Sequence, residues 1–292
     1  MTMLGGVETG GTWCVCAVGT GPGEIVAEAQ FRTSNPADTL ARIIAFFRSA
    51  PPADAIGIGS FGPVDLDPRS PTWGHVTTTP KPGWQHVAVA PVIRDQLGVP
   101  VAFDNDVTAA AIGEHRWGAG RGTDSLCYLT VGTGIGAGLL IDGRPVHGLV
   151  HPEVGHIRIP RDRDQQPFRG VCPVHGDCWE GLASGPAIAE RWQASPQELG
   201  DDHPAWEIEA DYLALGILSI VLVASPRRVI VGGGVMERPS LLQMVRGRLR
   251  ELVAGYLDTP SLGEDIGSYV VAPGLGDRAG VLGALALAQE AL

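Results

Sequence analysis

Lysine is almost absent from this chain of 292 residues. Of its 21 basic residues only Lys81 is a lysine, and all the others are arginines. A phosphate-binding loop of the form GxxxxGKS or GxxxxGKT requires a lysine that is followed by serine or threonine. Because Lys81 is followed by Pro82, the sequence excludes this class of nucleotide-binding loop.

The chain also lacks a long hydrophobic run and an excess of positive charge. Its longest apolar run, residues 213–224, is too short to cross a bilayer, and residues 1–11 have neither the basic region nor the apolar core of a signal peptide. We therefore expect a cytoplasmic protein with no membrane partner. A net charge of −11 argues against a nucleic-acid partner. It does not exclude a nucleotide, because backbone N–H groups can hold small phosphates.

Glycine, in contrast, is plentiful. The 41 glycines accompany a hydrophobic content of 44%, which excludes a disordered chain. Glycines in a chain with a core indicate tight turns, or backbone that lies close to a ligand. Residues 57–62 match the dinucleotide motif GxGxxG, but Pro63 follows where that motif needs a helix. A dinucleotide-binding fold of that kind is therefore excluded as well.

The order of elements predicts an α/β protein built from two similar halves. A strand, a glycine turn and a second strand over residues 4–19 recur over residues 125–143, and each set heads a series of helices and strands. We expect two α/β domains around a cleft, residues 1–117 and 118–278, with the last helix, 279–292, packed back on the first. The pattern also predicts a helix over 240–256 and a strand over 268–274.

The two glycine turns are candidate phosphate-binding sites. The first contains Gly10, Gly11 and Thr12, and the second contains Gly132, Thr133 and Gly134. Consecutive N–H groups without side chains can point at an anion, and the threonine can add a hydroxyl donor. Either turn alone is more typical of an ordinary hairpin. The occurrence of both, at matching places in the two halves, favours a clamp for a polyphosphate.

A cluster of cysteine and histidine is a candidate metal site. It contains Cys172, His175 and Cys178, with His156 sixteen positions before Cys172. Four nitrogen and sulfur ligands are typical of a closed structural zinc site, whereas two surface thiols or a local disulfide are the alternatives. A zinc ion would fix Glu153 and Glu180 relative to each other, in the loop 151–180. Carboxylates held in a cleft suit hydrogen bonds from the hydroxyl groups of a polyol.

The other histidines and cysteines show no such pattern. We expect the remaining histidines to lie on the surface or in loops: His75, His86, His115, His147, His151 and His203. We expect the cysteines of the predicted strands to be packing residues: Cys14, Cys16 and Cys127.

The polar run Asp104, Asn105 and Asp106 lies at the end of a predicted strand, immediately before a predicted helix. One of the three fits the helix N-cap, for which Asp and Asn are preferred, although Thr108 competes for that role. The functional interpretation makes Asp106 a general base that takes a proton from a sugar hydroxyl as it attacks the γ-phosphorus of ATP, with Mg²⁺ bridging the phosphates. No Ser-His-Asp or Cys-His arrangement competes with it.

In their order along the chain, these residues resemble the ROK (repressor, open reading frame, kinase) sugar kinases, which have the actin-like, ribonuclease-H-like ATPase fold. The resemblance covers nearly the whole chain. It is strongest to the bacterial fructokinase branch, which has glutamate at the position of Glu8 and a segment similar to residues 172–187. The segments that carry the resemblance are 6–12, 59–63, 79–84, 105–106, 132–138, 151–156, 172–180 and 232–234.

The resemblance implies a role for each matching residue. Asp106 would be the catalytic base, and the two glycine turns would hold the ATP phosphates. A further turn, Gly232 to Gly234 with Gly233 at its centre, would lie against the adenosine. The residues that bind sugar hydroxyls would be Asn105, Glu153, His156 and Glu180. The zinc ligands would be His156, Cys172, His175 and Cys178.

Two positions depart from the pattern of the family. The first turn usually ends Gly-Gly-Thr-Lys, but Trp13 stands here in place of the lysine, which removes one positive charge close to the phosphates. Thr108 stands where the family has the second asparagine of Asn-Asp-x-Asn. Because Asp106 itself is retained, we expect activity.

These features predict an ATP-dependent hexose kinase that uses Mg²⁺ and a structural Zn²⁺ and converts D-fructose to fructose 6-phosphate. A kinase for glucose, mannose or another hexose is one alternative, and a non-catalytic, zinc-dependent sugar-binding protein is another. Repressors of the family carry an N-terminal helix-turn-helix, whereas residues 8–12 of the first motif follow almost directly on Met1. We therefore expect no binding to nucleic acid. The resemblance also implies a homodimer.

Overall fold

Two compact units make up the chain, and the computed structural model describes residues 2–161 and 167–292. The first unit comprises Met1–Gly122, Gly138–Pro152 and Gly274–Leu292, and the second comprises Thr123–Ala137 and Glu153–Pro273. Residues 117 and 278, the boundaries predicted from the sequence, lie near two of the points where the chain passes between units. The sequence did not predict that Gly138–Pro152 belongs to the first unit.

A five-stranded sheet with the order β3-β2-β1-β4-β5 forms the centre of the first unit. Its strands are β1 (Leu4–Thr9), β2 (Trp13–Gly21), β3 (Glu24–Arg32), β4 (Ala55–Ser60) and β5 (Val101–Asn105). β1 and β2 pair antiparallel, as do β2 and β3, whereas β4 is parallel to both β1 and β5. The carboxyl ends of β1, β4 and β5 therefore meet at one edge of the sheet, where the candidate base segment and the first glycine turn begin.

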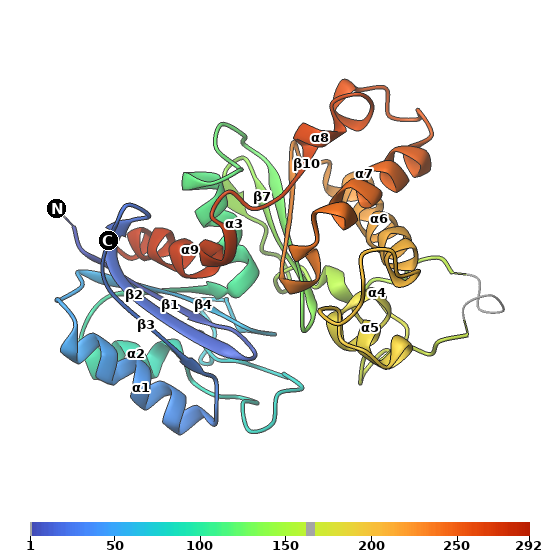
Figure 1. The fold of residues 1–292 in the computed structure, drawn as a ribbon. Helices are drawn as coiled ribbons and strands as arrows, with labels where there is room; N and C mark the ends of the chain where they lie inside the picture. Colours follow the sequence, from blue (N-terminus) through green and yellow to red (C-terminus); the bar gives the residue numbers. More distant parts are fainter. Residues whose placement is uncertain (1, 162–166) are drawn as a thin grey trace. The chain divides into compact units, whose positions relative to one another are not determined.

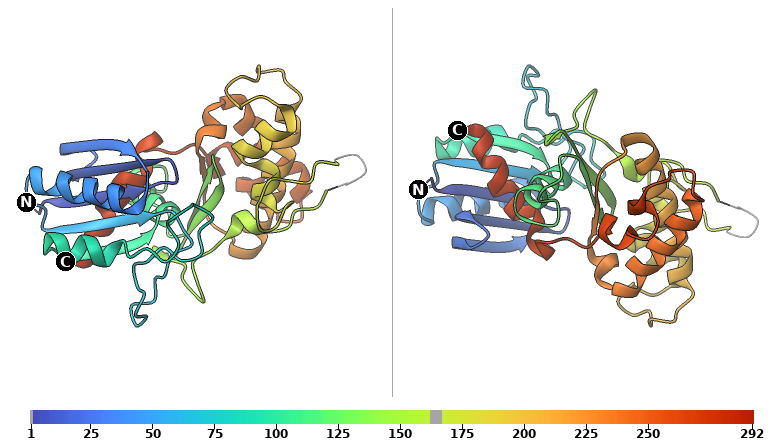
Figure 2. Two further views of the ribbon diagram at one scale, coloured as in Figure 1. Left: turned by 90° about the horizontal axis from the view of Figure 1, so that it is seen from below. Right: turned by 90° about the horizontal axis from the view of Figure 1, so that it is seen from above.

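Helices cover both faces of this sheet (Figure 1). One face carries α1 (Pro36–Ser49) and α2 (Ala90–Leu97), and the other carries α3 (Asp106–Trp117) and α9 (Ala279–Leu287). The right-hand view of Figure 2 shows α9 running across the strands. Successive residues of a strand face opposite sides of a sheet, so Gly5 lies against Phe47 of α1 and Gly6 against Leu285 of α9.

Apolar side chains fill the space on each face of the sheet. The buried residues toward α1 and α2 include Val7, Ile43, Phe47, Ile58 and Ile93. Those toward α9 include Leu4, Ala17, Ala55, Val281 and Leu285. Full burial of one such large side chain contributes about 1.5–3 kcal/mol to folding. The cysteines predicted to pack in strands, Cys14, Cys16 and Cys127, are all fully buried, which confirms that prediction.

Local sequence signals fix where two of these helices begin. Asn35 caps α1 by accepting a hydrogen bond from the N–H of Asp38, and Pro36 occupies the first turn. Asn105 caps α3, because its Oδ1 accepts the N–H of Thr108 at 2.7 Å. The N-cap role within the polar run therefore falls to Asn105, which makes Asp106 the first residue of α3.

A second five-stranded sheet has the order β10-β9-β6-β7-β8. Its strands are β6 (Leu126–Val131), β7 (Ile135–Ile141), β8 (Arg144–Pro145), β9 (Val229–Gly232) and β10 (Val270–Val271). β6 and β9 are parallel neighbours, with Thr130 opposite Gly232. Their carboxyl ends therefore coincide, and the second glycine turn and the Gly232–Gly234 turn both begin there.

The helices of the second unit are α4 (Trp179–Ala183), α5 (Gly185–Trp192), α6 (Ala205–Ala224), α7 (Pro239–Val253) and α8 (Ile266–Tyr269). α6 and α7 lie side by side (Figure 1). Short 3₁₀ helices are η1 (Val154–His156), η2 (Gly234–Glu237) and η3 (Pro260–Leu262) in this unit, and η4 (Gly276–Arg278) and η5 (Ala288–Ala291) in the first. Among the described residues, no helix combines the length and the apolar character that crossing a membrane requires.

Two predicted elements are corrected by the structure. The helix expected over 240–256 ends at Val253, because Ala254 and Gly255 adopt left-handed conformations with φ of 50° and 73°. The strand expected over 268–274 is reduced to Val270–Val271. The preceding residues form α8 instead, where the N–H of Ser268 bonds to the carbonyl of Asp265 at 2.8 Å.

We expect Gly283→Ala to destabilise the protein by about 1–3 kcal/mol, measured by urea unfolding. A Cβ at Gly283 in α9 would lie 1.9 Å from the carbonyl oxygen of Ala109 in α3, so the added methyl group must push these helices apart. Gly247→Ala in α7 is the matched control, because no atom lies within 4 Å of its added Cβ. This variant should gain about 0.5–1 kcal/mol from helix propensity. A similar gain in Gly283→Ala would contradict the close packing of α3 and α9.

Candidate active site and metal centre

Asp106 occupies the first turn of α3, directly after the carboxyl end of β5. Its Oδ1 accepts the N–H of Val107 at 2.9 Å, and the side chain is half-buried. Burial raises the pKa of the Asp106 carboxyl from 3.8 to about 6, despite the opposing effect of the backbone hydrogen bonds. A general base is most effective when its pKa lies near the working pH. The carboxylate of Asp106 is therefore suited to accept a proton near neutrality.

A second carboxyl group, that of Glu8 in β1, lies close enough to Asp106 for the two charges to interact. Glu8 packs against the first turn of α9, where a Cβ on Gly280 would come within 2.2 Å of the Glu8 carboxyl carbon. Burial, followed by the charge of Asp106, raises the pKa of Glu8 from 4.5 to about 7, although a backbone hydrogen bond with Val281 opposes this rise. Acidic side chains with raised pKa values at the carboxyl ends of strands are typical of a functional site.

The first glycine turn connects β1 and β2, beside Glu8 in the sequence. Its carbonyl groups bond to the protein: Gly10 O accepts the Thr33 hydroxyl at 2.8 Å, and Thr12 O accepts the Thr33 N–H at 3.0 Å. Within the described part of the chain, the N–H groups of Gly11 and Thr12 have no hydrogen-bond acceptor. Two adjacent N–H groups without an acceptor can bind an anion such as a phosphate oxygen.

The second glycine turn and the Gly232–Gly234 turn lie side by side in the second unit. A Cβ on Gly132 would lie 3.8 Å from the nitrogen of Gly234, and one on Gly233 would lie 2.4 Å from the carbonyl oxygen of Val131. Gly233 has a φ of 94°, which favours glycine at this position. The structure therefore brings together two of the predicted nucleotide-binding segments, at the carboxyl ends of the parallel strands β6 and β9.

A cavity of about 360 Å³ adjoins the Gly232–Gly234 turn. Its lining includes Gly234, Val235, Trp206 and Arg238, and the guanidinium of Arg238 lies 4.3 Å from the centre of the Trp206 ring. Ligand pockets of small molecules have volumes of about 300–1,000 Å³ and are mostly apolar with a few polar groups. The cavity therefore has the size of a ligand pocket, and its lining combines apolar residues with polar and charged ones.

Glu180, in the first turn of α4, contacts the second glycine turn. Its Oε2 accepts the N–H of Ile135 at 3.1 Å, and a Cβ on Gly134 would lie 2.6 Å from that oxygen. Glu153 lies directly before η1, the 3₁₀ helix that ends at His156. The backbone ties these two segments together, because the N–H of Trp179 bonds to the carbonyl of Ile157 at 2.9 Å.

The four residues predicted to bind zinc come together: His156, Cys172, His175 and Cys178. Their ligand atoms all lie within 4.8 Å of one another. Nδ1 of His156 is 3.5 Å from Sγ of Cys178, and Nδ1 of His175 is 3.7 Å from Sγ of Cys172. Zinc bonds of about 2.0–2.3 Å in a tetrahedron place ligand atoms roughly 3.3–3.8 Å apart. The donor set and its spacing therefore fit a tetrahedral zinc ion.

Two histidines that the sequence placed on the surface or in loops have defined partners next to the candidate base. His151 is buried, and its Nε2 accepts the N–H of Val64 at 3.1 Å. Nε2 of His147 lies 3.0 Å from Oδ2 of the buried Asp104, which raises the pKa of His147. Oδ1 of Asp104 accepts the N–H of Asn105 at 2.7 Å. Both histidines lie in loops, as expected, and His147 is exposed, whereas His151 is buried. The sequence did not predict their partners, because contacts between distant segments determine them.

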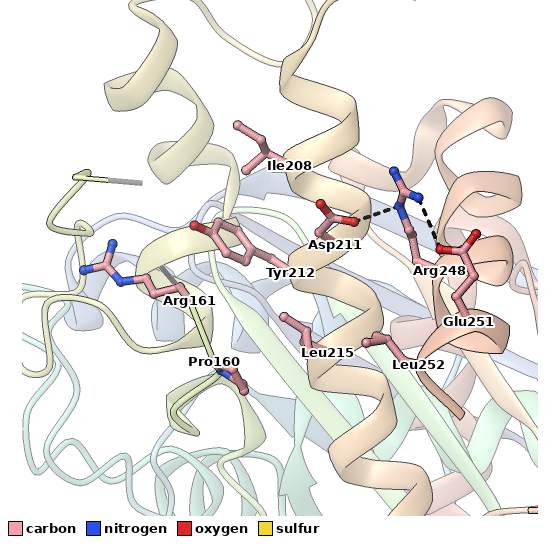
Figure 3. Close-up of a pocket in the computed structure, with 9 residues that line it drawn as sticks. All are labelled: Pro160, Arg161, Ile208, Asp211, Tyr212, Leu215, Arg248, Glu251 and Leu252. Atoms are coloured by element: carbon pink, nitrogen blue, oxygen red, sulfur yellow. Dashed lines mark hydrogen bonds and ion pairs between the residues drawn. The ribbon is translucent and has the colours of Figure 1, made fainter. Parts of the chain in front are cut away.

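A larger cavity, of about 550 Å³, lies elsewhere in the second unit and contains none of the predicted site residues. Asp211 and Glu251 both point toward Arg248 within it (Figure 3). The Arg248 guanidinium pairs with Asp211 at 2.8 Å and with Glu251 at 3.3 Å. Arg161, which also lines the cavity, pairs with Asp177 at 2.9 Å. Because these charged groups already have partners, the cavity is a weaker candidate.

The amino-acid sequence matches the profile of the ROK family over residues 4–291. This chain belongs to the ROK family. A putative fructokinase of Bacillus subtilis is 46% identical to it over 290 residues, which cover 99% of this chain and 96% of the relative. The fructokinase of Zymomonas mobilis is 44% identical over 299 residues, which cover 99% and 97%. The resemblance to the ROK sugar kinases, and to their fructokinase branch, is thereby confirmed.

Solved structures of ROK proteins share the fold over the whole chain. A ROK hexokinase from Thermus thermophilus superposes with a TM-score of 0.80 at 26% identity, covering 99% of this chain and 98% of the other. A ROK family glucokinase from Streptomyces griseus, in complex with glucose and AMPPNP, gives a TM-score of 0.78 at 29% identity and covers 99% of both chains. The predicted fold class, an α/β protein of the actin-like ATPase fold, is therefore confirmed.

The raised pKa of Glu8 predicts a stability that depends on pH. With a folded-state pKa of about 7 against an ordinary value of 4.5, the folded protein retains a proton that the unfolded chain has released. Stability therefore falls as pH rises through this interval, and the ionised carboxyl destabilises the fold above it. In the absence of divalent cations, we expect Glu8→Gln to raise the free energy of unfolding by about 1–3 kcal/mol near pH 8 and by little near pH 5.

Urea unfolding at both pH values measures this difference, and Glu264→Gln, at an exposed position, is the matched control. The control should change stability little at either pH. An equal gain from Glu8→Gln at the two pH values would mean that ionisation of Glu8 is not the cause.

Proposed function

We propose that this protein transfers the γ-phosphoryl group of ATP to a hexose, and that D-fructose is its preferred substrate. The observation that carries the proposal is the half-buried Asp106, with a pKa of about 6, at the start of α3 in a chain 46% identical to a putative fructokinase. A base of this kind, near phosphate-binding turns, is what phosphoryl transfer to a hydroxyl group requires.

In this mechanism Asp106 is the general base. Its carboxylate accepts the proton of the sugar 6-hydroxyl group while the hydroxyl oxygen attacks the γ-phosphorus of ATP. The bond between that phosphorus and the bridging oxygen breaks, and ADP leaves with the electron pair. Because the pKa of Asp106 is about 6, the carboxylate form predominates at neutral pH and is ready to accept the proton.

The sugar would be held by four side chains that retain polar atoms for this purpose: Asn105, Glu153, His156 and Glu180. Asn105 uses its Oδ1 for the helix cap, so its amide N–H₂ group would donate to a sugar oxygen. Glu180 uses Oε2 for the N–H of Ile135, so Oε1 would accept from a sugar hydroxyl. His156 directs Nδ1 to the cysteines, which assigns Nε2–H to the sugar.

The phosphates of ATP would be held by backbone N–H groups and threonine hydroxyls of the two glycine turns, Gly10, Gly11, Thr12 and Gly132, Thr133, Gly134. The adenosine would lie in the 360 Å³ cavity, against Gly232 and Gly233 and beside Trp206. Mg²⁺ would neutralise phosphate charge, and Glu8 offers the carboxylate oxygen that this ion prefers. We also retain in this proposal the homodimer and the cytoplasmic location predicted from the sequence.

A structural zinc ion, held by His156, Cys172, His175 and Cys178, completes the proposal. Four protein ligands leave no open position on the metal, so it would not activate water. Its contribution would be to hold η1 and α4 together and thereby orient Glu153, His156 and Glu180. The short distances among the four ligand atoms support this assignment.

Asp106→Asn should lower kcat with fructose by roughly 10²–10⁴-fold, because the amide cannot accept the proton. A coupled assay of ADP release with ATP and a panel of fructose, glucose and mannose measures both the loss and the sugar preference. Asp95→Asn, at an exposed position of α2, is the control and should retain normal turnover.

Near-normal turnover of Asp106→Asn would contradict the assignment of the base. Glucose is the competing substrate, because the Streptomyces griseus relative was solved with that sugar. A higher kcat/KM for glucose than for fructose would replace the proposed substrate while leaving the reaction intact. Absence of ADP release with every sugar would leave a sugar-binding protein as the remaining interpretation.

Metal analysis of protein purified without chelator should find about one zinc ion per chain. Cys178→Ser should lose that zinc and most of the hexokinase activity, because the loop that orients Glu180 is no longer held. Cys127→Ala, in β6 and fully buried, is the matched control that removes a thiol elsewhere and should keep its zinc. Zinc-free wild-type protein of full activity would contradict the site.

A further inference from the structure

Lys81, the single lysine of the sequence, contacts the first glycine turn. Its ammonium nitrogen Nζ donates a hydrogen bond to the carbonyl oxygen of Gly11 at 2.5 Å. The same nitrogen lies 5.9 Å from the centre of the Phe61 ring, within the range of a cation–π interaction. Seventy positions separate Lys81 from Gly11, so the fold and not the local sequence makes this contact.

The segment that carries Lys81 is anchored to the core of the first unit. Trp84 is fully buried, and its Nε1 donates to the carbonyl of Ser34 at 2.8 Å. The Trp84 ring meets the Phe61 ring edge-on, with 5.0 Å between their centres. The N–H of Lys81 bonds to the hydroxyl of the buried Thr79 at 3.3 Å. The lysine side chain therefore starts from a fixed position, and the residue is half-buried.

Lys81 completes the hydrogen bonding of the carbonyl groups in the first turn. Thr33 donates to the carbonyl oxygens of Gly10 and Thr12, and Lys81 donates to that of Gly11 between them. With all three carbonyls engaged, the turn is held in the conformation that leaves the N–H groups of Gly11 and Thr12 available to an anion. Loss of the Lys81 contact would release the middle carbonyl of this set.

The charge of Lys81 is not neutralised by a neighbour. Among the described residues, no carboxylate lies within ion-pair distance of its ammonium group. The other cation near this turn, Arg32, lies over the exposed ring of Trp13, 4.3 Å from its centre. Arg32 therefore contacts the indole, whereas Lys81 contacts the turn itself.

We propose that Lys81 is the cation of the first phosphate-binding turn. It orients the N–H groups of Gly11 and Thr12 toward a nucleotide phosphate by holding the Gly11 carbonyl, and it adds a positive charge at the turn that Trp13 does not supply. Lys81 is thus a positioning residue for the phosphate. The proposal rests on the ATP site of the proposed function and deepens it.

The test compares nucleotide affinity with sugar affinity in Lys81→Met. Calorimetry with the Mg²⁺ complex of AMPPNP should show a Kd increased about tenfold or more, because a charge-assisted contact is lost. KM for ATP should rise similarly, whereas KM for fructose should stay within about twofold. The dependence of Kd on salt concentration should also become weaker, which a purely structural role would not cause.

Three further variants keep the test decisive if Lys81→Met is unstable. Lys81→Arg retains the charge and should recover most of the affinity for AMPPNP. Trp13→Lys combined with Lys81→Met supplies a cation from the other end of the same turn and should also recover it. Arg32→Met is the matched control that removes the neighbouring cation and should leave Kd within about twofold of the wild type.

A Kd for AMPPNP within twofold of the wild type in Lys81→Met would overturn the proposal. An equal rise in the KM values of ATP and fructose would overturn it too, because it would indicate general damage to the fold. The calorimetric comparison does not depend on turnover. A wild type that binds AMPPNP but phosphorylates no hexose would therefore refute the proposed function and still decide the role of Lys81.

Discussion

Helices α3 and α9 pack so closely that a side chain at Gly283 would overlap the backbone of Ala109, and the positions of both candidate carboxyl groups depend on this contact. Asp106 is the first residue of α3, and Glu8 packs against Gly280 in the first turn of α9. The two helices share one face of the sheet. Their separation therefore influences how near Glu8 and Asp106 lie, and the charge of Asp106 contributes to the raised pKa of Glu8. Glycine at this crossing is a requirement of the site as well as of the core.

In the second unit, the candidate sugar-binding residues lie next to the Cys/His cluster and not between packed helices. In the described residues 153–161 and 167–180, regular structure is limited to η1, the start of α4 and an isolated bridge between Cys172 and Gly176. The side chains of His156, Cys172, His175 and Cys178 meet in this segment, and the N–H of Trp179 bonds to the carbonyl of Ile157. A metal cross-link suits a short, polar segment, because its stabilisation does not require buried apolar area. In the proposed function, helix packing would position the base in one unit, and the metal ligands would position the sugar-binding side chains in the other.

Features that depend on local sequence could be predicted, and those that depend on distant segments could not. The N-cap at Asn105, the hairpin of β1 and β2, and the spacing of the Cys/His cluster all follow from residues within a short stretch. The environments of His147 and His151 instead depend on Asp104 and Val64, which lie far away in the sequence. The length of β10 also depends on a distant segment. The β-rich composition of residues 268–274 predicted a longer strand, but only Val270–Val271 pairs with β9. Hydrophobic pattern predicts which residues face a core, but not which polar groups meet across it.

The negative net charge of the protein makes the position of its single lysine important for phosphate binding. A protein with a net charge of −11 repels a nucleotide at long range, so phosphate affinity must come from donors placed within a few ångströms. Arginine predominates among the cations, and several arginines pair with carboxylates, such as Arg227 with Asp124 and Arg248 with Asp211. The planar guanidinium suits such pairs, whereas an ammonium group is a compact point charge that fits against a single carbonyl oxygen. The one lysine of the sequence lies at the first glycine turn, where its ammonium group bonds to the single carbonyl oxygen of Gly11.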